Sequence, residues 1–430
     1  MKRTLPRLIA LFERSPRRAL WWISALMVLI TCARYAQSPP RPTDDQTSNW
    51  WPVVNAVLDG RGFVSCLPEY FPFCTEDSPT AMREPLPLLM HAGVAALCGR
   101  SLWAASAWQA LLNIVAAWML FYLVRRLGGT RTGLVAAMLW ALYIPAYWDV
   151  INIAGDQLAV VAVLGAALMF ERSMRTRRGI DLLLAGLMFG AAALCRSASI
   201  AFGAVAGVTV LLRDREVSIM HRLRSAGLLA TGIALALAPW ALRNQRVFHH
   251  LFLGSTLSGY NLFRHNSAIT SENYCHFVAA EEGQHYLDSL ITAHPELTHR
   301  ENEAEMNALY AAAGKATIAQ HPGRYLVLSG YRALPLWTNW GVNAAYGKPF
   351  GAIDTAIALL QLVLLMSALL GFAQRPRWRW VIGAAIAVFC VMHMLVVCRL
   401  RFLIPAMPLV ICLAALPLER LLPRDPDRPS

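Results

Sequence analysis

The sequence predicts an all-α polytopic membrane protein with about ten transmembrane helices, and three observations support this fold class. Of the 430 residues, 57% are hydrophobic and only 15% are charged, whereas soluble domains carry about a quarter charged residues. The chain contains repeated apolar runs close to the length of about 20 residues that a helix needs to cross a bilayer. Its arginines form short clusters between these runs. This pattern excludes a disordered or fibrous chain and most cytosolic enzymes.

The apolar runs define the predicted spans. Most have the length of a membrane helix, whereas the adjacent runs 180–195 and 198–212 are short and are expected to be two spans that meet in a tight turn at Arg196. The predicted spans are 19–37, 102–124, 131–148, 153–171, 180–195, 198–212, 224–242, 351–373, 379–397 and 402–418.

Two further apolar segments are not predicted to cross. Residues 86–98 are short, and a crossing there would move Arg125 and Arg126 to the opposite side of the membrane. We therefore expect a helix that lies in the outer interface of the bilayer. The same parity argument places residues 325–340 on the outer surface.

The basic clusters predict the orientation of the chain. A net charge of +13 would suggest nucleic acid as a partner, but the bias of cytoplasmic loops towards Lys and Arg explains basic residues that flank apolar runs. We therefore expect no nucleic-acid partner, and a membrane protein with both termini in the cytoplasm. The clusters are Lys2, Arg3, Arg7, Arg14, Arg17 and Arg18; Arg125, Arg126 and Arg131; Arg172, Arg175, Arg177 and Arg178; Arg213, Arg215, Arg222 and Arg224; Arg375, Arg377 and Arg379; and Arg420, Arg424 and Arg428. Residues 32–36 form a poor cleavage site for a signal peptidase, so the first apolar run is expected to be a membrane anchor.

This orientation predicts the division of the chain. Residues 1–242 would form a transmembrane catalytic module that includes the first outer loop, 38–101. Residues 243–350 would form a periplasmic loop with a small helical domain, because 277–325 have an ordinary soluble composition, and 351–430 would form the last spans and a cytoplasmic tail. Cys66 and Cys74 share the first outer loop, and they are either a disulfide, if that side is oxidising, or two free thiols.

Polar side chains at the outer ends of the spans are the candidate functional residues, because a charge near hydrocarbon usually faces a partner or a water-filled cavity. Arginine binds phosphate oxygens bidentately, and a carboxylate can activate a hydroxyl or hold a divalent cation. Such a set suits a lipid substrate that carries a phosphate. The candidates are Asp44, Asp45, Arg83, Glu84, Asp149, Asp156, Arg196, Arg243, Asn244, Arg399 and Arg401.

Each candidate also has a purely structural interpretation. Asp44 or Asp45 would cap a helix over 47–59, and Asp156 would cap or complement the dipole of its span. Arg83 and Glu84 would be a solvated pair before a helix that Pro85 starts. Asp149 would be an interface residue, Arg196 a lipid-headgroup contact, and Arg243 a side chain that reaches back to the interface. The histidines of 243–350 have no HExxH spacing, so the usual sequence motif of a zinc site is absent. The chain also has no GxSxG, P-loop or GxGxxG motif, so the usual motifs of serine hydrolases and nucleotide-binding proteins are absent too.

Several short motifs, in this order on this topology, resemble the GT-C superfamily of integral-membrane glycosyltransferases. Its relatives include protein O-mannosyltransferases, the lipid A aminoarabinose transferase and RgtA/B-like enzymes. The motifs are Asp44-Asp45 followed by the helix and Gly-x-Gly of residues 50–63; Arg83-Glu84-Pro85-Leu86-Pro87 ("REPxYP"); Gly155-Asp156-Gln157; Cys195-Arg196-Ser197 ("LxRPS"); Pro239-Trp240 with Arg243-Asn244 ("PWxxRN"); Gly259-Tyr260-Asn261-Leu262 ("GxNL"); and Arg399 to Pro408 ("RFRxPxxP"). Two details depart from the family pattern: Trp50 lies five residues after Asp45 and six after Asp44, and the Arg196 turn lacks the family's proline.

The resemblance implies inverting transfer of a sugar from a polyprenyl phosphate to a glycan, lipid or protein acceptor on the periplasmic face. Asp45 or Asp44 would be the general base, alone or through a divalent cation such as Mg²⁺ or Mn²⁺, and Asp156 would assist it. The polyprenyl tail would lie in the membrane lipid near residues 86–98. The implied substrate-binding residues are Arg83, Glu84, Arg196, Arg243, Asn244, Asn261, Arg399 and Arg401.

Two other classes of protein fit the same topology. A lipid or glycan transporter would carry charges in mid-span and repeated halves, neither of which is visible. A non-catalytic scaffold with the same fold would tolerate changes of Asp45 and Asp156.

Overall fold

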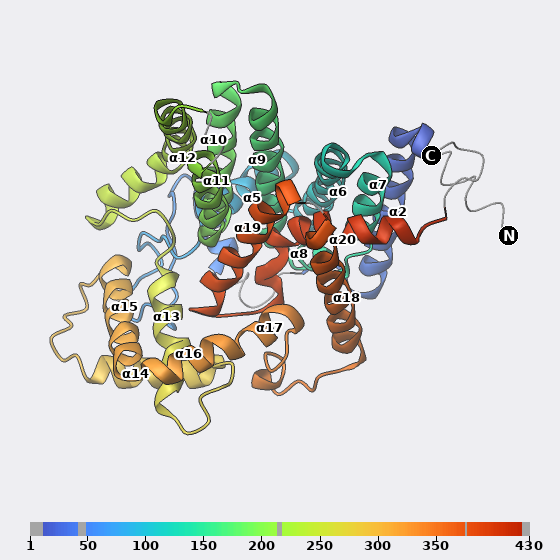
Figure 1. Cartoon of the computed structure of the whole chain (residues 1–430). Coiled ribbons are helices and arrows are strands. Elements are labelled where there is room, and N and C mark those ends of the chain that lie inside the picture. Colours follow the sequence, from blue (N-terminus) through green and yellow to red (C-terminus); the bar gives the residue numbers. More distant parts are fainter. Residues whose placement is uncertain (1–11, 42–48, 213–216, 375, 424–430) are drawn as a thin grey trace.

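The computed structural model describes residues 12–41, 49–212, 217–374 and 376–423. The regular structure of these residues is almost entirely helical, and their one β-feature is an isolated bridge between Val64 and Pro79. Figure 1 shows a bundle of long helices with a group of shorter helices, α13 to α17, packed at one end. The predicted all-α membrane fold is confirmed.

Six helical segments are long and apolar enough to cross a membrane. They are α2 (Pro16–Gln37), α6 (Leu102–Gly128), α9 (Asp156–Thr176), α12 (Ile219–Phe248), α18 (Ala352–Gln374) and the continuous run of η5 (Leu400–Ala406) with α20 (Met407–Leu421). Each coincides with a predicted span. The predicted boundary at residue 242 falls inside α12, which continues to Phe248.

A seventh crossing is broken. The predicted span 131–148 is α7 (Thr130–Ala141) followed by η1 (Ile144–Tyr147) and α8 (Trp148–Asn152), and the two parts are bent by 57°. Pro145 explains the break, because proline has no amide proton to donate and disfavours helical geometry in the residue before it.

The other three predicted spans are shorter apolar helices. They are α10 (Gly179–Cys195), η2 (Ser197–Ser199) with α11 (Ile200–Leu212), and α19 (Pro376–Met394). Each of the ten predicted spans is therefore helical, and six or seven reach the length and apolarity of a full crossing among the described residues. α5 (Pro85–Cys98), predicted to lie in the interface, is likewise a short apolar helix.

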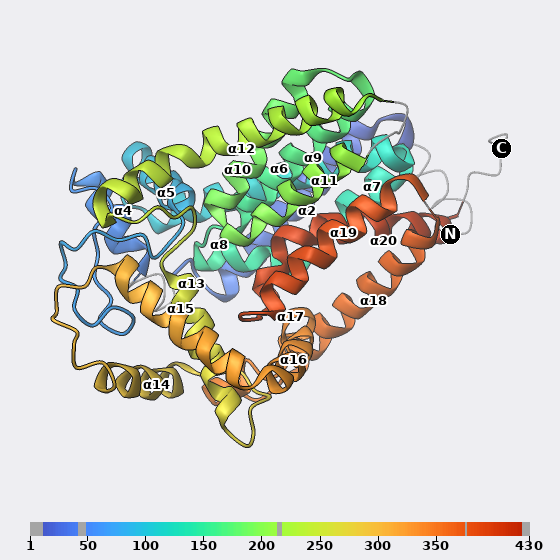
Figure 2. The same cartoon turned by 60° about the vertical axis from the view of Figure 1, so that its left-hand side comes forward.

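The arginine-rich ends of the spans gather at one end of the bundle. Arg131 lies 3.7 Å from the Glu13 carboxylate and donates to the Leu422 carbonyl oxygen at 2.7 Å, while Arg126 pairs with Glu171 at 2.9 Å. These contacts join the end of α6 and the start of α7 to the residues just before α2, the end of α20 and the end of α9. Figure 2 shows α13 to α17 at the opposite end.

The opposite end contains the two predicted outer loops, which share one small core. Leu67, Phe71 and Met82 of the first loop pack against Tyr260 and Tyr310 of the second. The helices of this end are α4 (Trp51–Leu58), α13 (Leu257–Ser267), η3 (Ala268–Thr270), α14 (Ala280–Thr292), α15 (Glu303–Gln320), α16 (Pro322–Tyr331), α17 (Ala333–Thr338) and η4 (Ala344–Tyr346). We call these helices, with the first loop, the outer domain.

Cys66 and Cys74 form a disulfide in the outer domain, which decides between the two alternatives left by the sequence. The other seven cysteines are free, with Cys32, Cys98 and Cys275 exposed. Full-length protein purified without reductant and denatured in N-ethylmaleimide should therefore incorporate seven labels by mass spectrometry, and nine after reduction. A Cys66→Ala/Cys74→Ala variant should incorporate seven in both conditions; nine labels on unreduced wild type would contradict the pairing.

Candidate active site

The turn that precedes α9 has an unusual backbone. Ile153, a buried β-branched residue, has φ +55°, a left-handed conformation that such residues rarely adopt and that is common at functional sites. The next carbonyl oxygen, of Ala154, accepts a hydrogen bond from the Gln109 side chain and lies 3.3 Å from Nε2 of the buried His91. These contacts hold the turn against α5 and α6.

Gly155 brings the same turn into contact with the first outer loop. A Cβ at this position would lie 2.6 Å from Cβ of Pro87 and 3.0 Å from the ring of Trp50. Only glycine fits this contact without movement of neighbouring atoms. The turn, α4 and α5 are therefore held together directly beside Asp156.

Asp156 is the first residue of α9 and the buried centre of an ion triad whose two arginines are partly exposed. Its side chain is 4% exposed, and its two oxygens pair with different arginines. Oδ1 accepts from Nη1 of Arg196, at the end of α10, and Oδ2 lies 2.6 Å from Nε of Arg401, in η5. The triad carries a net charge of +1.

Aromatic rings fix both arginines of the triad. The Arg196 guanidinium lies 4.3 Å from the centroid of Phe402, and the Arg401 guanidinium lies 4.4 Å from that of Trp148. Such cation–π contacts stabilise a guanidinium while leaving its edge free to hydrogen bond. Sequence reasoning missed Trp148 and Phe402 as members of this site.

Glu84 links the first loop to the triad. Its carboxylate accepts hydrogen bonds from the Ser197 amide at 3.1 Å and from the Ser197 hydroxyl at 2.8 Å. Ser197 follows Arg196 and Glu84 follows Arg83, so this contact brings two predicted motifs together. Glu84 occupies the N-cap position of α5 but makes no capping bond there, so capping does not account for it.

Arg243 and Asn244 form a second cluster at the end of α12. Arg243 donates to the Phe63 carbonyl oxygen at 3.1 Å, and the rings of Phe63, Trp240 and Phe248 surround its guanidinium. Asn244 is fully buried and donates to the Phe252 carbonyl oxygen at 3.2 Å. This cluster holds the first loop against α12.

Arg399 has contacts of its own outside the triad. Arg399 donates to the Tyr346 hydroxyl at 2.7 Å and lies 4.6 Å from the centroid of Phe277. Asn261 is half-buried on α13, and Asp149 lies within α8.

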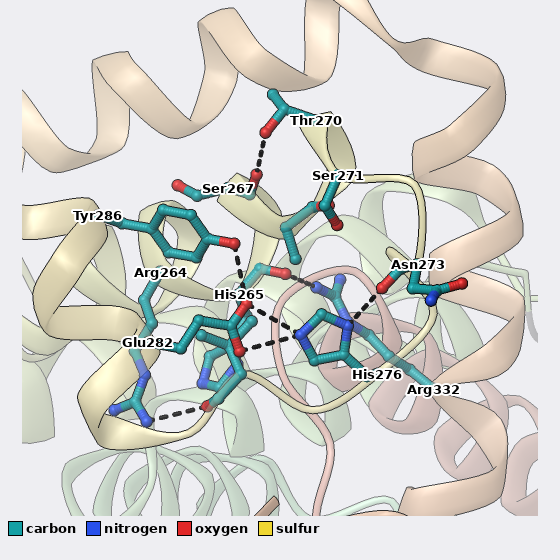
Figure 3. A network of polar contacts seen from close by, with 12 residues as sticks. Arg264, His265, Ser267, Thr270, Ser271, Asn273, His276, Glu282, Tyr286 and Arg332 are labelled. Atoms are coloured by element: carbon teal, nitrogen blue, oxygen red, sulfur yellow. Dashed lines mark hydrogen bonds and ion pairs between the residues drawn. The ribbon is translucent and has the colours of Figure 1, made fainter. Parts of the chain in front are cut away.

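A polar network anchors α13 to the bundle (Figure 3). Arg332 donates to the His265 carbonyl oxygen at 2.6 Å and to the Met394 carbonyl oxygen at 3.2 Å, which joins α13 to the end of α19. Glu282 accepts from the Tyr286 hydroxyl at 2.8 Å and lies 2.9 Å from Nε2 of His276. Burial and the neighbouring arginines hold the pKa of His265 well below its ordinary value, so its ring is neutral.

Glu303 is a further polar residue that sequence reasoning missed. Its carboxylate accepts from the Ala81 amide and from the Thr256 hydroxyl, both at 2.8 Å, and burial raises its pKa. It therefore fixes the loop two residues before Arg83. The sequence signal at this place, Asn302 with Glu305, indicates a capping box, which the structure contains, and it makes Glu303 look like an ordinary acidic residue in the first turn of a helix.

Asp44 and Asp45 lie outside the described residues, but both flanks of their segment are described. The Arg41 amide donates to the Ile151 carbonyl oxygen at 3.3 Å, and Trp50 contacts Gly155. Both flanks therefore lie beside the turn that carries Asp156. The described helix that follows, α4, begins at Trp51 with Trp50 in the N-cap position, and the predicted capping by Asp44 or Asp45 falls outside the described residues.

The described residues do not provide a metal site at the triad. No three His, Cys, Asp or Glu side chains among them are placed to hold a metal ion. Both oxygens of Asp156 already face guanidinium groups, whose charge disfavours a cation beside them.

The protein is a multi-pass membrane protein whose fold is shared with solved glycosyltransferases. The Archaeoglobus fulgidus oligosaccharyltransferase, solved with zinc and sulfate, is 13% identical with a TM-score of 0.52, over 93% of this chain and 49% of that one. AglB from Archaeoglobus fulgidus, solved with an inhibitory peptide and a dolichol-phosphate, is 11% identical with a TM-score of 0.51, over 93% and 50%. ArnT from Cupriavidus metallidurans, bound to undecaprenyl phosphate, is 14% identical with a TM-score of 0.40, over 93% and 77%.

The sequence comparison points to the same class. Residues 77–242 match the family described as dolichyl-phosphate-mannose-protein mannosyltransferase. No curated protein matches the chain. The predicted resemblance to GT-C glycosyltransferases is therefore confirmed, and the chain spans about half the length of the archaeal enzymes that it resembles.

Proposed function

We propose that the protein is a membrane glycosyltransferase that moves a sugar from a polyprenyl-phosphate donor to a glycan, lipid or protein acceptor. The observation that carries this proposal is the triad that Arg196 and Arg401 form around the buried Asp156. Two of its three members lie within residues 77–242, which match a glycosyltransferase family.

The two arginines of the triad would bind the leaving phosphate. Arg196 and Arg401 carry one more positive charge than Asp156 neutralises, and guanidinium edges match phosphate oxygens. Asp156 would hold both guanidiniums in position. Arg83 would be a third phosphate ligand, because the hydrogen bond between the Ser197 hydroxyl and Glu84 holds its segment beside that of Arg196. Stabilisation of the charge that develops on the leaving phosphate lowers the barrier to transfer.

Asp45 or Asp44 would act as the general base. The carboxylate would take the proton of the acceptor hydroxyl while that oxygen bonds to the anomeric carbon and the bond to the phosphate oxygen breaks. A single displacement of this kind inverts the configuration of that carbon. Asp156 is poorly suited to this step because both of its oxygens are already paired.

The outer domain would face the periplasm, and the arginine-rich end would face the cytoplasm with both termini. Two observations support this orientation of a bacterial inner membrane protein: the positive-inside rule, and the Cys66–Cys74 disulfide, because disulfides persist in oxidising compartments. The polyprenyl tail would lie in the bilayer against α5, which exposes Leu89 and Leu97. Arg243 and Arg399 would shape the outer domain around the acceptor.

The donor class follows by analogy with the archaeal neighbour AglB, which was solved with a dolichol-phosphate and a peptide. A divalent cation is not assigned a step, because Asp156 does not fit one. A cation held by Asp44 or Asp45 would appear as inhibition by EDTA.

Release of undecaprenyl phosphate from a panel of undecaprenyl-phosphate sugars tests the proposal. Purified wild-type protein should consume one donor, and an Asp44→Asn/Asp45→Asn variant should lose at least about 100-fold of this rate. Asp59→Asn, which changes a half-exposed outer carboxylate paired with Arg100, is the matched control. Equal turnover by the double variant would refute the assigned base, and donor binding without turnover in every protein would favour a transporter or a scaffold.

A further inference from the structure

A cavity of about 540 Å³ opens at the arginine-rich end of the bundle, opposite the candidate active site. The ends of four helices enclose it: the end of α9, the start of α10, the end of α11 and the start of α12. Nothing in the proposed transfer reaction uses this place.

The cavity is basic. Arg177, His221, Arg222 and Arg224 line it, and no lining residue carries a carboxylate. Arg222 donates to the Leu211 carbonyl oxygen at 3.0 Å. Within the described part of the chain, the side chains of Arg177 and Arg224 make no hydrogen bond or ion pair, so their guanidiniums are available to a ligand.

The described acidic side chains at the end of α9 and the start of α10 already have partners. Asp181 pairs with Arg172 at 3.3 Å and accepts from the Thr176 hydroxyl at 2.9 Å. Glu171 pairs with Arg126 and Arg175. The first turn of the 30-residue helix α12, capped by Ser218, adds the positive end of a helix dipole to the cavity wall. The cavity therefore favours an anion.

The inner part of the cavity is apolar and closed. Leu182, Val210 and Leu228 line it, and α10 meets α12 immediately beyond them. A Cβ at Gly186 would lie 2.2 Å from the Leu229 carbonyl oxygen, and one at Gly232 would lie 2.2 Å from that of Leu183. The two helices are thus in backbone contact there, and a bound group is limited to the space between the arginines and this floor.

The helix ends that enclose the cavity also expose aliphatic side chains. Leu212, at the end of α11, and Ile219, Met220 and Leu223, at the start of α12, are exposed, and the exposed fractions of Leu212 and Met220 reach 76% and 71%. We call these four residues the apolar rim. Exposed aliphatic side chains that alternate with basic ones are typical of a helix at the boundary of headgroups and acyl chains. A ligand at this depth would have both a charged and an apolar part.

We propose that this cavity binds the phosphate headgroup of an anionic phospholipid. Arg177 and Arg224 contact the phosphate, and the apolar rim contacts the acyl chains. Basic pockets between membrane helices on the cytoplasmic side are a recurring type of lipid site. A soluble phosphate would satisfy the arginines but would leave the apolar rim without a partner.

The test uses the purified full-length protein in detergent, where no bilayer surface competes. Native mass spectrometry with added phosphatidylglycerol, phosphatidylcholine or inorganic phosphate should show one retained phosphatidylglycerol on wild type. Phosphatidylglycerol should also raise the melting temperature, whereas the other two additives should not. Equal retention of phosphatidylcholine, or the same thermal shift from inorganic phosphate, would overturn the proposal without any variant.

Two matched variants locate the site. Arg177→Gln/Arg224→Gln should bind phosphatidylglycerol at least about tenfold more weakly, because each arginine near a lipid headgroup contributes attraction. Arg17→Gln/Arg18→Gln removes the same charge from exposed positions at the start of α2 and should bind as wild type does. Equal retention by the cavity variant and wild type would refute the assignment. The proposed site of sugar transfer lies at the other end of the bundle. The lipid-binding result would therefore stand even if no sugar transfer were detected.

Discussion

Asp156→Asn should lower the rate of sugar transfer at least about 100-fold and also destabilise the membrane core. The carboxylate is buried between Arg196 and Arg401, so its loss leaves two positive charges close together with no counter-charge. Breaking a buried pair in this way costs about 3–5 kcal/mol. Turnover of the lipid-linked donor and the melting temperature measure the two effects.

Two further variants separate catalysis from stability. Asp156→Asn/Arg196→Gln removes one charge of each sign and should regain part of the lost stability, while transfer stays low because a proposed phosphate ligand is missing. Asp59→Asn breaks half-exposed pairs with Arg61 and Arg100, and such pairs contribute at most about 1 kcal/mol. Wild-type turnover by Asp156→Asn would show that the triad has no part in the reaction.

Gly155→Ala should reduce the transfer rate by about 10- to 100-fold, although it adds a single methyl group. That methyl group would lie 2.6 Å from Pro87, and neither the proline ring nor the turn before α9 can give way without shifting Asp156 or α5. Displacement of a reacting constellation by about 1 Å can cost about 100-fold in rate. The measurement is kcat/KM for the lipid-linked donor.

Gly165→Ala is the matched control, because it makes the same change inside α9, the helix that the Gly155 turn precedes. A Cβ there would lie 3.4 Å from the end of Met119, an ordinary contact with a flexible side chain. It should keep wild-type turnover. Equal rates for both variants would show that the contact of α9 with α5 does not position the site.

The spans could be predicted because apolarity is a local property of the chain. A run of about 20 apolar residues must form a helix in lipid, where every backbone group needs an internal partner. The prediction of one straight span over 131–148 was less accurate, because the helix bends there by 57°. Pro145 explains the bend and is visible in the sequence. For the three shorter apolar helices, α10, α11 and α19, length alone does not decide whether the helix crosses the membrane.

The motifs were readable, but their partners were not. Glu84 and Arg196 were both predicted site residues, and only the structure shows that Ser197 joins their segments. Arg243 was predicted to bind substrate, whereas its observed contacts are the Phe63 carbonyl oxygen and three aromatic rings. Glu303 was not predicted at all, because its role depends on Ala81, 222 residues away.

The sequence by itself determined the helical membrane class, the positions of the spans, the gathering of arginines at one end and the residue types of the site. The tertiary structure alone decided that Asp156 pairs with Arg196 and Arg401, which lie 40 and 245 residues away, and that a basic cavity forms where four helix ends meet. The reason is physical: hydropathy and charge act along the chain, whereas an ion pair forms only where packing brings distant helices within hydrogen-bond distance.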